Sequence, residues 1–352
     1  MRIVVGLSGG VDSSVAAALL KEQGHDVIGV TMKLWNGKYK GGTKDACFSP
    51  HEQDDIDAAK KIADMLGIEH HVIDCADDYD KTIIQYFKDS YANGLTPNPC
   101  VRCNAEFKFG LLPLLAEKKL GKFDKFATGH YARVLYSDTA CCYSLHMAKC
   151  LKKDQSYFLS RLSQDQLSKI MLPLGDFASK AEVRELARKY GFETADKDDS
   201  MDFYSGDIAE LIDKPDEIGN IVDLNGRILG KHNGFWHYTI GQRHGLNISA
   251  AEPMYVVDIK SCHNAVVVGT RDQACKNSFK VKDIRWTTND PSMTITVDVK
   301  IRSSGHNLYR CSLGMDGIVT SIEQDKPMFG VTPGQFAVFY CGDMVVGSGI
   351  IC

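Results

Sequence analysis

The sequence of 352 residues lacks a hydrophobic run long enough to cross a membrane. It passes from Met1 and Arg2 directly into a short apolar run, without the apolar region and small-residue cleavage site of a signal peptide. We therefore expect a cytoplasmic protein with no membrane partner. The net charge is only −4, so the composition gives no overall attraction to nucleic acid. A nucleic-acid partner would have to be held by a local basic face.

The chain also lacks the context that would turn its twelve cysteines into a disulfide framework. Disulfide scaffolds are short secreted domains, whereas these cysteines are spread over a long chain without a signal sequence. Cys100 and Cys103 have C-x-x-C spacing, but no second close pair with the spacing of zinc ligands accompanies them. Most of the cysteines are therefore expected to be reduced thiols. The length and the hydrophobic content of 44% suit two or three domains with their own cores.

The most informative segment is a turn rich in glycine and serine at residues 6–14. It follows the apolar run 3–5 and precedes the helix-like run 15–21, an order that brings backbone N–H groups and a helix dipole to a phosphate. The segment has neither the lysine of a Walker A loop nor the spacing of a dinucleotide fingerprint. It resembles the Ser-Gly-Gly-x-Asp-Ser loop of N-type ATP pyrophosphatases, which adenylate an oxygen and let a nucleophile displace AMP. A plain turn would need only one glycine, so chemistry at ATP is the first hypothesis.

The first 205 residues alternate between strand and helix patterns. Strands are predicted at 3–5, 26–32, 70–74 and 125–128, and helices at 52–66, 79–91 and 104–119. Strands separated by such helices indicate an α/β domain with a doubly wound parallel sheet, similar to the adenine nucleotide alpha hydrolases. Ligands of these sheets bind at the carboxyl ends of the strands, where the opening turn lies.

The pattern changes after about residue 205 to short alternating segments. Asn/Asp-Gly dipeptides at 225–226, 233–234 and 316–317 predict hairpin turns, and residues 293–301 and 335–340 read as strands. We expect a catalytic α/β domain over residues 1–205, a small central β-rich module over 206–272 and a C-terminal β-barrel over 273–352.

Cys100 and Cys103 stand just before a helical pattern. A thiol at a helix N-terminus has a lowered pKa, so one of the two is expected to be reactive. It could be a nucleophile or persulfide carrier, half of a zinc or iron–sulfur site, or one of two structural thiols. Beside an adenylating loop, a sulfur nucleophile could displace AMP from an activated oxygen.

Further segments make the resemblance specific. They are Thr-Pro-Asn-Pro-x-x-x-Cys-Asn at 96–104, Ala-Thr-Gly-His-Tyr at 127–131, Lys-Asp-Gln-Ser-Tyr-Phe-Leu at 153–159, Tyr-Thr-Ile-Gly-Gln-Arg at 238–243 and Val-Thr-Pro-Gly-Gln at 331–335. With the opening loop, they resemble the tRNA-specific 2-thiouridylase family, MnmA, over nearly the whole chain. The resemblance implies a tRNA-uridine 2-sulfurtransferase that activates the C2 oxygen of the wobble uridine, position 34, with ATP and Mg²⁺. Its implied partners are tRNAs of the lysine, glutamate and glutamine type and a sulfur donor protein or free sulfide, with the central module binding tRNA.

The resemblance also implies site residues. ATP would be held by Gly6, Leu7, Ser8, Gly9, Gly10, Val11, Asp12 and Ser13, with Met32 against the adenine and Gly129 close to the nucleotide. The catalytic residues would be Cys103, Cys100 and Asp12, and tRNA would contact Asn98, Pro99, Cys100, His130, Lys153, Asp154, Gln155, Arg302 and Gln335.

Plainer roles remain open for several of these residues. Lys153 could be a solvated charge, and His130 could make a satisfied hydrogen bond at a strand end. Asp12 could coordinate Mg²⁺, cap a helix beginning at Ser13, or do both.

One expected residue is absent from the chain. The family's second cysteine, the persulfide carrier, aligns with Tyr204 in the segment 197–207, and no cysteine lies between Cys150 and Cys262. Cys100 and Cys103 could then form the working thiol pair, with a disulfide as by-product. They could instead hold part of a [4Fe-4S] cluster that uses free sulfide.

Two wider alternatives follow from the same absence. The chain could be a non-thiolating paralogue that binds ATP and tRNA, or it could catalyse another adenylation-dependent reaction such as amidation. After Arg302 the family's Tyr-Arg is replaced by Ser303 and Ser304, so we expect weaker or altered contact with tRNA.

Overall fold

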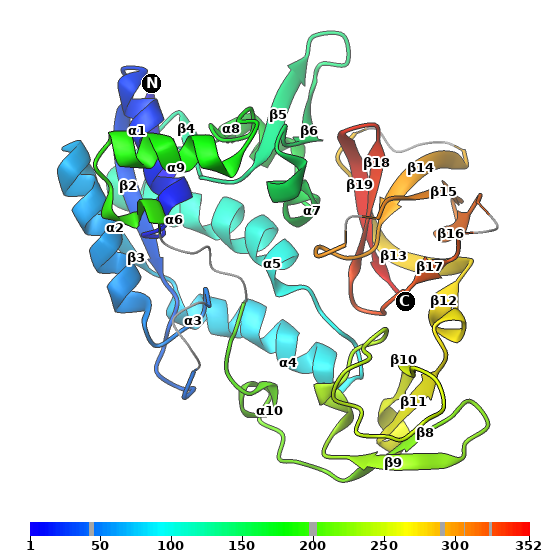
Figure 1. Ribbon diagram of the computed structural model, residues 1–352. Helices are drawn as coiled ribbons and strands as arrows, with labels where there is room; N and C mark the ends of the chain where they lie inside the picture. Colours follow the sequence, from blue (N-terminus) through cyan, green and yellow to red (C-terminus); the bar gives the residue numbers. More distant parts are fainter. Residues whose placement is uncertain (42–45, 197–202, 289–292, 306, 324–325) are drawn as a thin grey trace. The chain divides into compact units, whose positions relative to one another are not determined.

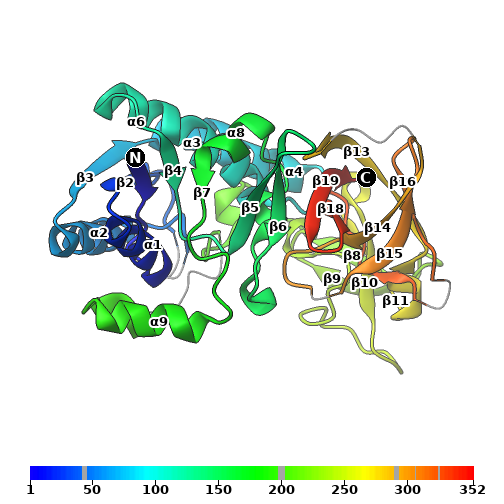
Figure 2. The ribbon, with the colours of Figure 1, turned by 90° about the horizontal axis from the view of Figure 1, so that it is seen from above.

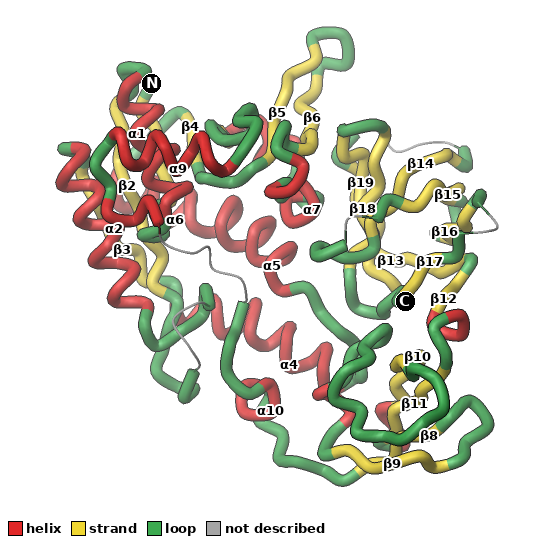
Figure 3. The backbone as a smooth tube through the Cα atoms, viewed as in Figure 1, coloured by secondary structure: helices red, strands yellow, loops and turns green. Residues whose placement is uncertain are grey.

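The computed structural model describes residues 1–41, 46–196, 203–288, 293–305, 307–323 and 326–352 (Figure 1). Backbone contacts divide the chain into two units. The first unit consists of Met1–Ile83, Cys100–Gly206 and Asp343–Val346, and the second of Ile84–Pro99, Asp207–Gly342 and Gly347–Cys352. Helices are concentrated in the first half of the chain and strands in the second, as the tube in Figure 3 shows. No helix within the described ranges is both long and apolar enough to cross a membrane.

The first unit is built on a five-stranded sheet in the order β3-β2-β1-β4-β7. Every pairing in it is parallel. The strands are β1 (Arg2–Gly6), β2 (Asp26–Lys33), β3 (Glu69–Asp74), β4 (Lys125–Ala127) and β7 (Ile170–Met171). Consecutive residues of β1 are buried because helices cover both faces, which explains its unbroken apolar run. The predicted parallel sheet is confirmed; β7, with two residues, was missed because it is too short to show a pattern.

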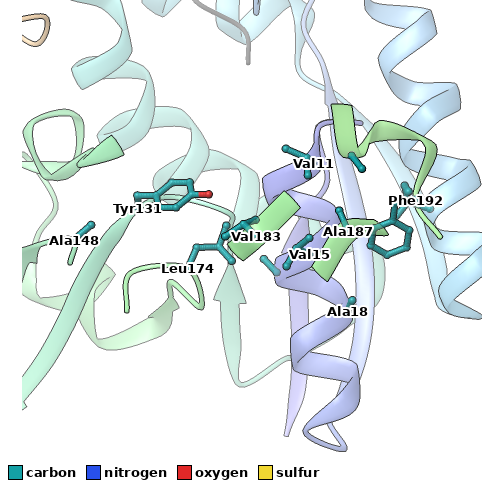
Figure 4. Close-up of a cluster of buried hydrophobic side chains, with 12 residues drawn as sticks. Val11, Val15, Ala18, Tyr131, Ala148, Leu174, Val183, Ala187 and Phe192 are labelled. Atoms are coloured by element: carbon teal, nitrogen blue, oxygen red, sulfur yellow. The ribbon is translucent and has the colours of Figure 1, made fainter. Parts of the chain in front are cut away.

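The helix that follows the glycine turn is buried on two sides. α1 (Val11–Glu22) places Ala17 and Leu20 in one cluster with the sheet residues Ile3 and Val5. Its other side packs on α9 (Lys180–Lys189), as the cluster in Figure 4 shows. The small alanines of α1 allow this close approach on both sides. The helix is thereby fixed in place behind the turn.

The opposite face of the sheet is covered by a long helical path from Pro99 to Leu120. It consists of α5 (Pro99–Arg102), the π-helical η2 (Cys103–Leu111) and α6 (Leu112–Leu120). The ring of Phe109 lies 6.1 Å from that of Phe126 in β4, and Figure 2 shows α6 and α9 on opposite sides of the sheet. The helix predicted over 104–119 is therefore present but begins earlier and contains a π segment.

Further helices and 3₁₀ turns occur within the described residues. They are α2 (Glu52–Leu66), α3 (Ala76–Tyr79), the π-helical η1 (Asp80–Ile84), α4 (Gln85–Ala92), α7 (Ser156–Leu159), α8 (Gln164–Lys169) and α10 (Ile208–Leu211), with 3₁₀ turns η3 (Leu151–Lys153), η4 (Glu193–Asp196), η5 (Phe235–His237), η6 (Ser261–His263) and η7 (Asp272–Ala274). The helix predicted over 52–66 is confirmed with the same bounds. It ends at Gly67, whose φ of 58° is left-handed and stops the helix.

A hairpin that the sequence analysis did not predict completes the first unit. β5 (Ala132–Ser137) pairs with β6 (Cys142–Met147), and β6 pairs with Met344 and Val345 at the start of β19 (Met344–Ile351). Asp343 accepts a hydrogen bond from His146 and forms an ion pair with Arg133. These contacts, that of His146 first, lower the pKa of Asp343. The last strand of the chain is thus tied to the middle of the sequence.

The second unit contains two β structures. A four-stranded sheet has the order β10-β11-β8-β9, and six strands in the order β13-β16-β15-β14-β18-β19 close into a barrel through the pairing of β19 with β13. Their bounds are β8 (Gly219–Val222), β9 (Ile228–His232), β10 (Tyr255–Lys260), β11 (Ala265–Gly269), β12 (Cys275–Lys276), β13 (Ser278–Trp286), β14 (Ile295–Lys300), β15 (Tyr309–Leu313), β16 (Ile318–Ser321), β17 (Met328–Phe329) and β18 (Phe336–Cys341). The predicted C-terminal β-barrel is confirmed.

Two of the three predicted hairpin turns are present. Gly226, with φ of 83°, joins the antiparallel strands β8 and β9, and Gly317, with φ of 77°, joins β15 and β16. The third prediction was wrong, because Gly234 leads into the 3₁₀ turn η5 instead of a partner strand. Trp236 and Phe235 of that turn are buried, so tertiary packing decided its conformation.

The buried thiol of Cys311 is expected to make the stability of the protein fall at alkaline pH. Burial raises its pKa to about 12, and its side chain has no exposed surface. Because this value exceeds the unfolded value of about 8.5, the contribution of Cys311 is complete below that pH and is lost as the pH rises toward the folded pKa. The free energy of unfolding of the wild-type protein should therefore fall more steeply above about pH 9 than that of Cys311→Ala, by up to about 1 kcal/mol per pH unit.

Urea titrations at a series of pH values measure this difference in slope. The exposed Cys341→Ser is the control, and equal slopes in wild type and Cys311→Ala would contradict the assignment.

Candidate nucleotide and thiol site

A pocket of about 420 Å³ lies at the carboxyl ends of the sheet strands in the first unit. This volume is in the range of small-molecule sites. Its lining consists of Gly6, Leu7, Ser8, Gly10, Val11, Asp12, Ser13, Val30, Met32, Cys47, Asp55, Lys108, Leu112, Thr128, Gly129, His130, Tyr131, Lys152, Lys153, Asp154 and Gln155. The structure thus brings together Met32, Gly129 and most of the residues expected to hold ATP. It adds four residues expected to contact tRNA, from His130 to Gln155.

Serine side chains hold the glycine turn in shape. Ser13 Oγ accepts a hydrogen bond from Ser8 N at 3.2 Å and donates to Gly10 O at 3.1 Å, and Ser14 Oγ donates to Gly10 O at 2.8 Å. Gly9 has φ of 69°, and a Cβ there would lie 2.5 Å from Asp55 O. The turn therefore requires glycine at that position. The first-turn amides of α1, which a helix leaves without intrahelical partners, are available to an anion at this end.

Gly129 allows a second close approach to the start of α1. A Cβ on Gly129 would lie 2.5 Å from Asp12 C and 2.6 Å from Ser13 N. These are backbone atoms of the helix that follows the glycine turn, so they cannot move aside as a side chain could. The position next to the nucleotide pocket therefore has to be glycine.

Asp12 has a different role from the predicted helix cap. α1 begins at Val11 with Gly10 as its N-cap, two residues earlier than expected, so the capping prediction was wrong. The Asp12 carboxylate instead accepts hydrogen bonds from Lys180 Nζ at 2.6 Å and Tyr131 Oη at 2.8 Å. A Mg²⁺ ion binding to this carboxylate would compete with the Lys180 ammonium. The ion pair also links α9 to the pocket.

The polar residues opposite the glycine turn are largely fixed by internal hydrogen bonds. Gln155 Oε1 accepts from Tyr131 N at 2.9 Å. Asp154 accepts from Ala148 N at 3.0 Å and from Ser156 Oγ at 2.8 Å. Asp154 therefore shapes the turn that presents its neighbours to the pocket.

His130 lies in the pocket as a neutral imidazole. Burial, followed by the charge of Lys108, holds its pKa well below the usual value. His130 Nδ1 and Thr128 Oγ1 form a hydrogen bond of 2.7 Å. Positive charge at the pocket therefore comes from lysines, Lys108, Lys152 and Lys153. Their position suits an anionic ligand.

Cys103 does not have the lowered pKa that was expected for a thiol at a helix N-terminus. The helix begins at Pro99, so Cys100 lies in its first turn, whereas Cys103 begins the π-helical η2. Burial raises the pKa of Cys103, although Lys108 and a hydrogen bond from the buried Tyr79 hydroxyl act in the opposite direction. The predicted lowering by the helix dipole was wrong for this residue, because desolvation outweighs the dipole beyond the first turn.

The donor set at Cys100 and Cys103 does not fit an iron–sulfur cluster. Throughout the part of the chain that the structure describes, no group of three or more His, Cys, Asp or Glu side chains could hold a metal ion. The segment 197–202 lies outside the described residues. The cluster expectation is not supported.

The remaining predicted residues lie in the second unit. Gln335 Nε2 donates to Thr96 O at 3.0 Å and to Pro97 O at 3.1 Å, and its Oε1 accepts from Asn98 Nδ2 at 3.3 Å. The side chain thus holds the Thr-Pro-Asn segment against the start of β18. Pro99, the next residue, begins α5.

Arg302 connects two further motifs of the second unit. Its guanidinium donates to Ile240 O and to Thr332 Oγ1, the latter at 2.5 Å. A Cβ on Gly241 would lie 3.4 Å from the same guanidinium. Segments 238–243 and 331–335, almost a hundred residues apart, are therefore neighbours in space.

The Gln335 contacts predict a loss of stability on substitution. Gln335→Leu removes the donors to Thr96 O and Pro97 O and should lower the free energy of unfolding by about 1–3 kcal/mol, because two partly buried carbonyls lose their partner. Chemical denaturation measures the change. Gln53→Leu, at an exposed position of α2, is the matched control and should change stability by less than about 0.5 kcal/mol. Equal effects of the two substitutions would contradict the role of Gln335.

Several pocket residues were not predicted from the sequence. They are Val30, Cys47, Asp55, Lys108, Leu112, Thr128, Tyr131 and Lys152, with Lys180 behind Asp12. Thr128 and Tyr131 belong to the recognised motif 127–131, so their place could have been inferred. Lys180 is far from Asp12 in the chain, and no local pattern could have paired them.

Comparisons with known proteins cover the whole chain. The family model described as tRNA methyl transferase HUP domain matches residues 1–204, and those described as tRNA methyl transferase PRC-barrel domain and Aminomethyltransferase beta-barrel domain match 210–270 and 276–351. A protein of Endomicrobium trichonymphae named tRNA-specific 2-thiouridylase MnmA is 44% identical, over 100% of this chain and 99% of the relative. The chain belongs to the MnmA family. The resemblance drawn from its motifs is confirmed.

Other MnmA proteins match to a similar extent. That of Gloeothece citriformis is 43% identical over 99% of both chains, and that of Synechocystis sp. is 42% identical over 100% of this chain and 97% of the relative. The relationship therefore includes the α/β sheet, the central sheet and the C-terminal barrel. MnmA membership does not rest on the glycine turn alone.

Proposed function

We propose that the protein catalyses ATP-dependent 2-thiolation of the wobble uridine, position 34, of tRNA. The observation that carries the proposal is the pocket behind the glycine turn, present in a chain that matches proteins named tRNA-specific 2-thiouridylase over its full length. Because its substrates are tRNA and ATP, we place the reaction in the cytoplasm.

The pocket residues suit the first half of this reaction. The glycine turn and the first turn of α1 bind the phosphates of ATP, with Mg²⁺ entering alongside the nucleotide. Leu7, Val30, Met32 and Leu112 offer an apolar surface to the adenine. The uridine C2 oxygen attacks the α-phosphorus, a new O–P bond forms and pyrophosphate leaves. Lys108, Lys152 and Lys153 stabilise the negative charge that moves to the leaving group.

Sulfur transfer forms the second half of the reaction. A nucleophilic sulfur adds to C2, and AMP leaves with the original oxygen. We assign catalytic roles to Cys103, Cys100 and Asp12, with Cys100 in the first turn of α5. Asn98, Pro99, Cys100, His130, Lys153, Asp154, Gln155, Arg302 and Gln335 form the proposed tRNA contacts. The substrates are tRNAs of the lysine, glutamate and glutamine type, and the sulfur comes from a donor protein or from free sulfide.

A deletion strain tests the function directly. Mass spectrometry of its tRNA nucleosides should show loss of 2-thiouridine derivatives and their return when the gene is restored. An unchanged nucleoside profile would reject thiolation and favour a non-thiolating paralogue. The absence of the second family cysteine at Tyr204 motivates that comparison.

A further inference from the structure

Cys47 is a further thiol that lines the nucleotide pocket. It lines the same pocket as the glycine turn, Lys108 and His130, and its side chain is exposed. Lys108 from η2 and Cys47 therefore reach one cavity from different segments of the first unit. A solvent-accessible thiol in this position can meet both a sulfur donor from solution and a ligand in the pocket.

Cys47 is also a neighbour of Cys103. The ring of Phe48, which follows Cys47, lies 5.7 Å from that of Tyr79, and the ring of Tyr79 lies 5.1 Å from that of Phe107 in η2, the segment that begins at Cys103. Tyr79 donates a hydrogen bond to the Cys103 sulfur, and burial, followed by the charges of Cys103, Cys100 and Cys47, raises the pKa of this hydroxyl. Both cysteines are free thiols. The site thus contains an exposed thiol and a more buried one, in segments that both pack on Tyr79.

Aromatic packing holds Cys47 beside the segment where a family cysteine is missing. Phe48 N donates to Phe203 O at 3.1 Å, and the two rings are stacked with centroids 6.1 Å apart. The ring of Phe48 also lies 6.3 Å from that of Tyr204 and 5.7 Å from that of Tyr79. Cys47 therefore adjoins the place of Tyr204 in space, although they are distant in sequence.

We propose that Cys47 carries the sulfur atom that is transferred and that Cys103 resolves the resulting intermediate. This inference rests on the proposed thiolation and assigns its second thiol to a residue from a different part of the chain. It replaces a relay through Cys100 and Cys103 alone.

The proposed reaction passes through a persulfide on Cys47. The Cys47 thiolate takes the terminal sulfur of an alkyl or protein persulfide, which leaves as a thiol, and becomes a persulfide itself. Its terminal sulfur attacks C2 of the adenylated uridine and AMP departs. The Cys103 thiolate then attacks the Cys47 sulfur, and the electron pair of the broken S–S bond remains on the sulfur attached to C2. The products are 2-thiouridine and a Cys47–Cys103 disulfide, which a dithiol reductant restores before the next turnover.

A single-turnover experiment tests this assignment. The full-length protein is loaded with glutathione persulfide, freed of excess donor and mixed with ATP, Mg²⁺ and a tRNA that carries a wobble uridine. Peptide mass analysis before mixing should find one added sulfur atom on Cys47, and analysis afterwards should find the Cys47–Cys103 disulfide. Cys47→Ser should lower 2-thiouridine formation at least about 100-fold. Cys262→Ser, at an exposed position of the second unit, should react like the wild type.

The reaction with inorganic sulfide distinguishes a role of Cys47 as sulfur carrier from a purely structural role. Sulfide can attack the adenylated uridine directly, so Cys47→Ser supplied with sulfide should form 2-thiouridine at the wild-type sulfide rate. The proposal would be overturned if Cys47→Ser lost both the persulfide and the sulfide reactions, or if it kept the wild-type rate with persulfide. It would also be overturned if Cys100→Ser lost the persulfide reaction while Cys47→Ser stayed active. If the wild-type protein itself forms no 2-thiouridine from either source, the proposed function fails instead.

Discussion

Cys103→Ser is expected to abolish release of 2-thiouridine while leaving ATP binding intact. Cys103 is not part of the pocket lining around the glycine turn, and serine can still accept the hydrogen bond from Tyr79, so the fold around the position should persist. A hydroxyl cannot attack a disulfide sulfur at a useful rate, which leaves the last step without a nucleophile. Formation of 2-thiouridine should fall at least about 100-fold.

The same variant gives a positive signal. Without the resolving thiol, the uridine should remain bound to the protein through a disulfide to Cys47. Denaturing gel analysis with labelled tRNA would detect this adduct, and a thiol reductant would release it. Cys341→Ser, an exposed position of β18, serves as the control. Normal release of 2-thiouridine by Cys103→Ser would remove this residue from the mechanism.

Gly129→Ala is expected to weaken ATP binding through a single methyl group. The new Cβ would lie 2.5 Å from Asp12 C and 2.6 Å from Ser13 N, distances at which the start of α1 has to move. Such overpacking costs about 1–3 kcal/mol, and it falls on the backbone that binds the phosphates. The Kd for ATP should rise at least about tenfold.

Isothermal titration with ATP and Mg²⁺ measures this loss. Gly305→Ala makes the same change where the nearest heavy atom would be 4.0 Å from the Cβ, so it should bind ATP like the wild type. An unchanged Kd for Gly129→Ala would mean that the turn can move without cost. Circular dichroism of both variants separates an effect on the pocket from unfolding.

The sequence predicted what depends on local pattern. The apolar run of β1, the glycine turn and the helix after it are consecutive in the chain, so their order indicated a phosphate site at one edge of a parallel sheet. The dipeptides ending in Gly226 and Gly317 predicted hairpins because a left-handed φ is needed there. In each case the determining interactions lie within a few residues.

Interactions between distant segments could not be read in this way. The Lys180 ammonium meets Asp12 only because α9 packs on α1, and burial by the surrounding chain reverses the expected pKa shift of Cys103. Cys47 belongs to none of the motifs in the sequence, and its place near Cys103 follows from the packing of Phe48 on Tyr79 and of Tyr79 on Phe107. Such contacts depend on the folded chain as a whole.

The π-helical segment η2 (Cys103–Leu111) sets the rotational phase between the thiol and the rest of its helix. A π turn contains an extra residue relative to an α turn, and each residue of an α-helix corresponds to a rotation of about 100°. Deleting one residue within η2 would let a regular α-helix form, but it would turn Cys103 away from Tyr79 while Leu112 and Ala116 stayed packed. Natural variation in this segment should therefore be confined to substitutions, since an insertion or deletion would shift the thiol out of phase.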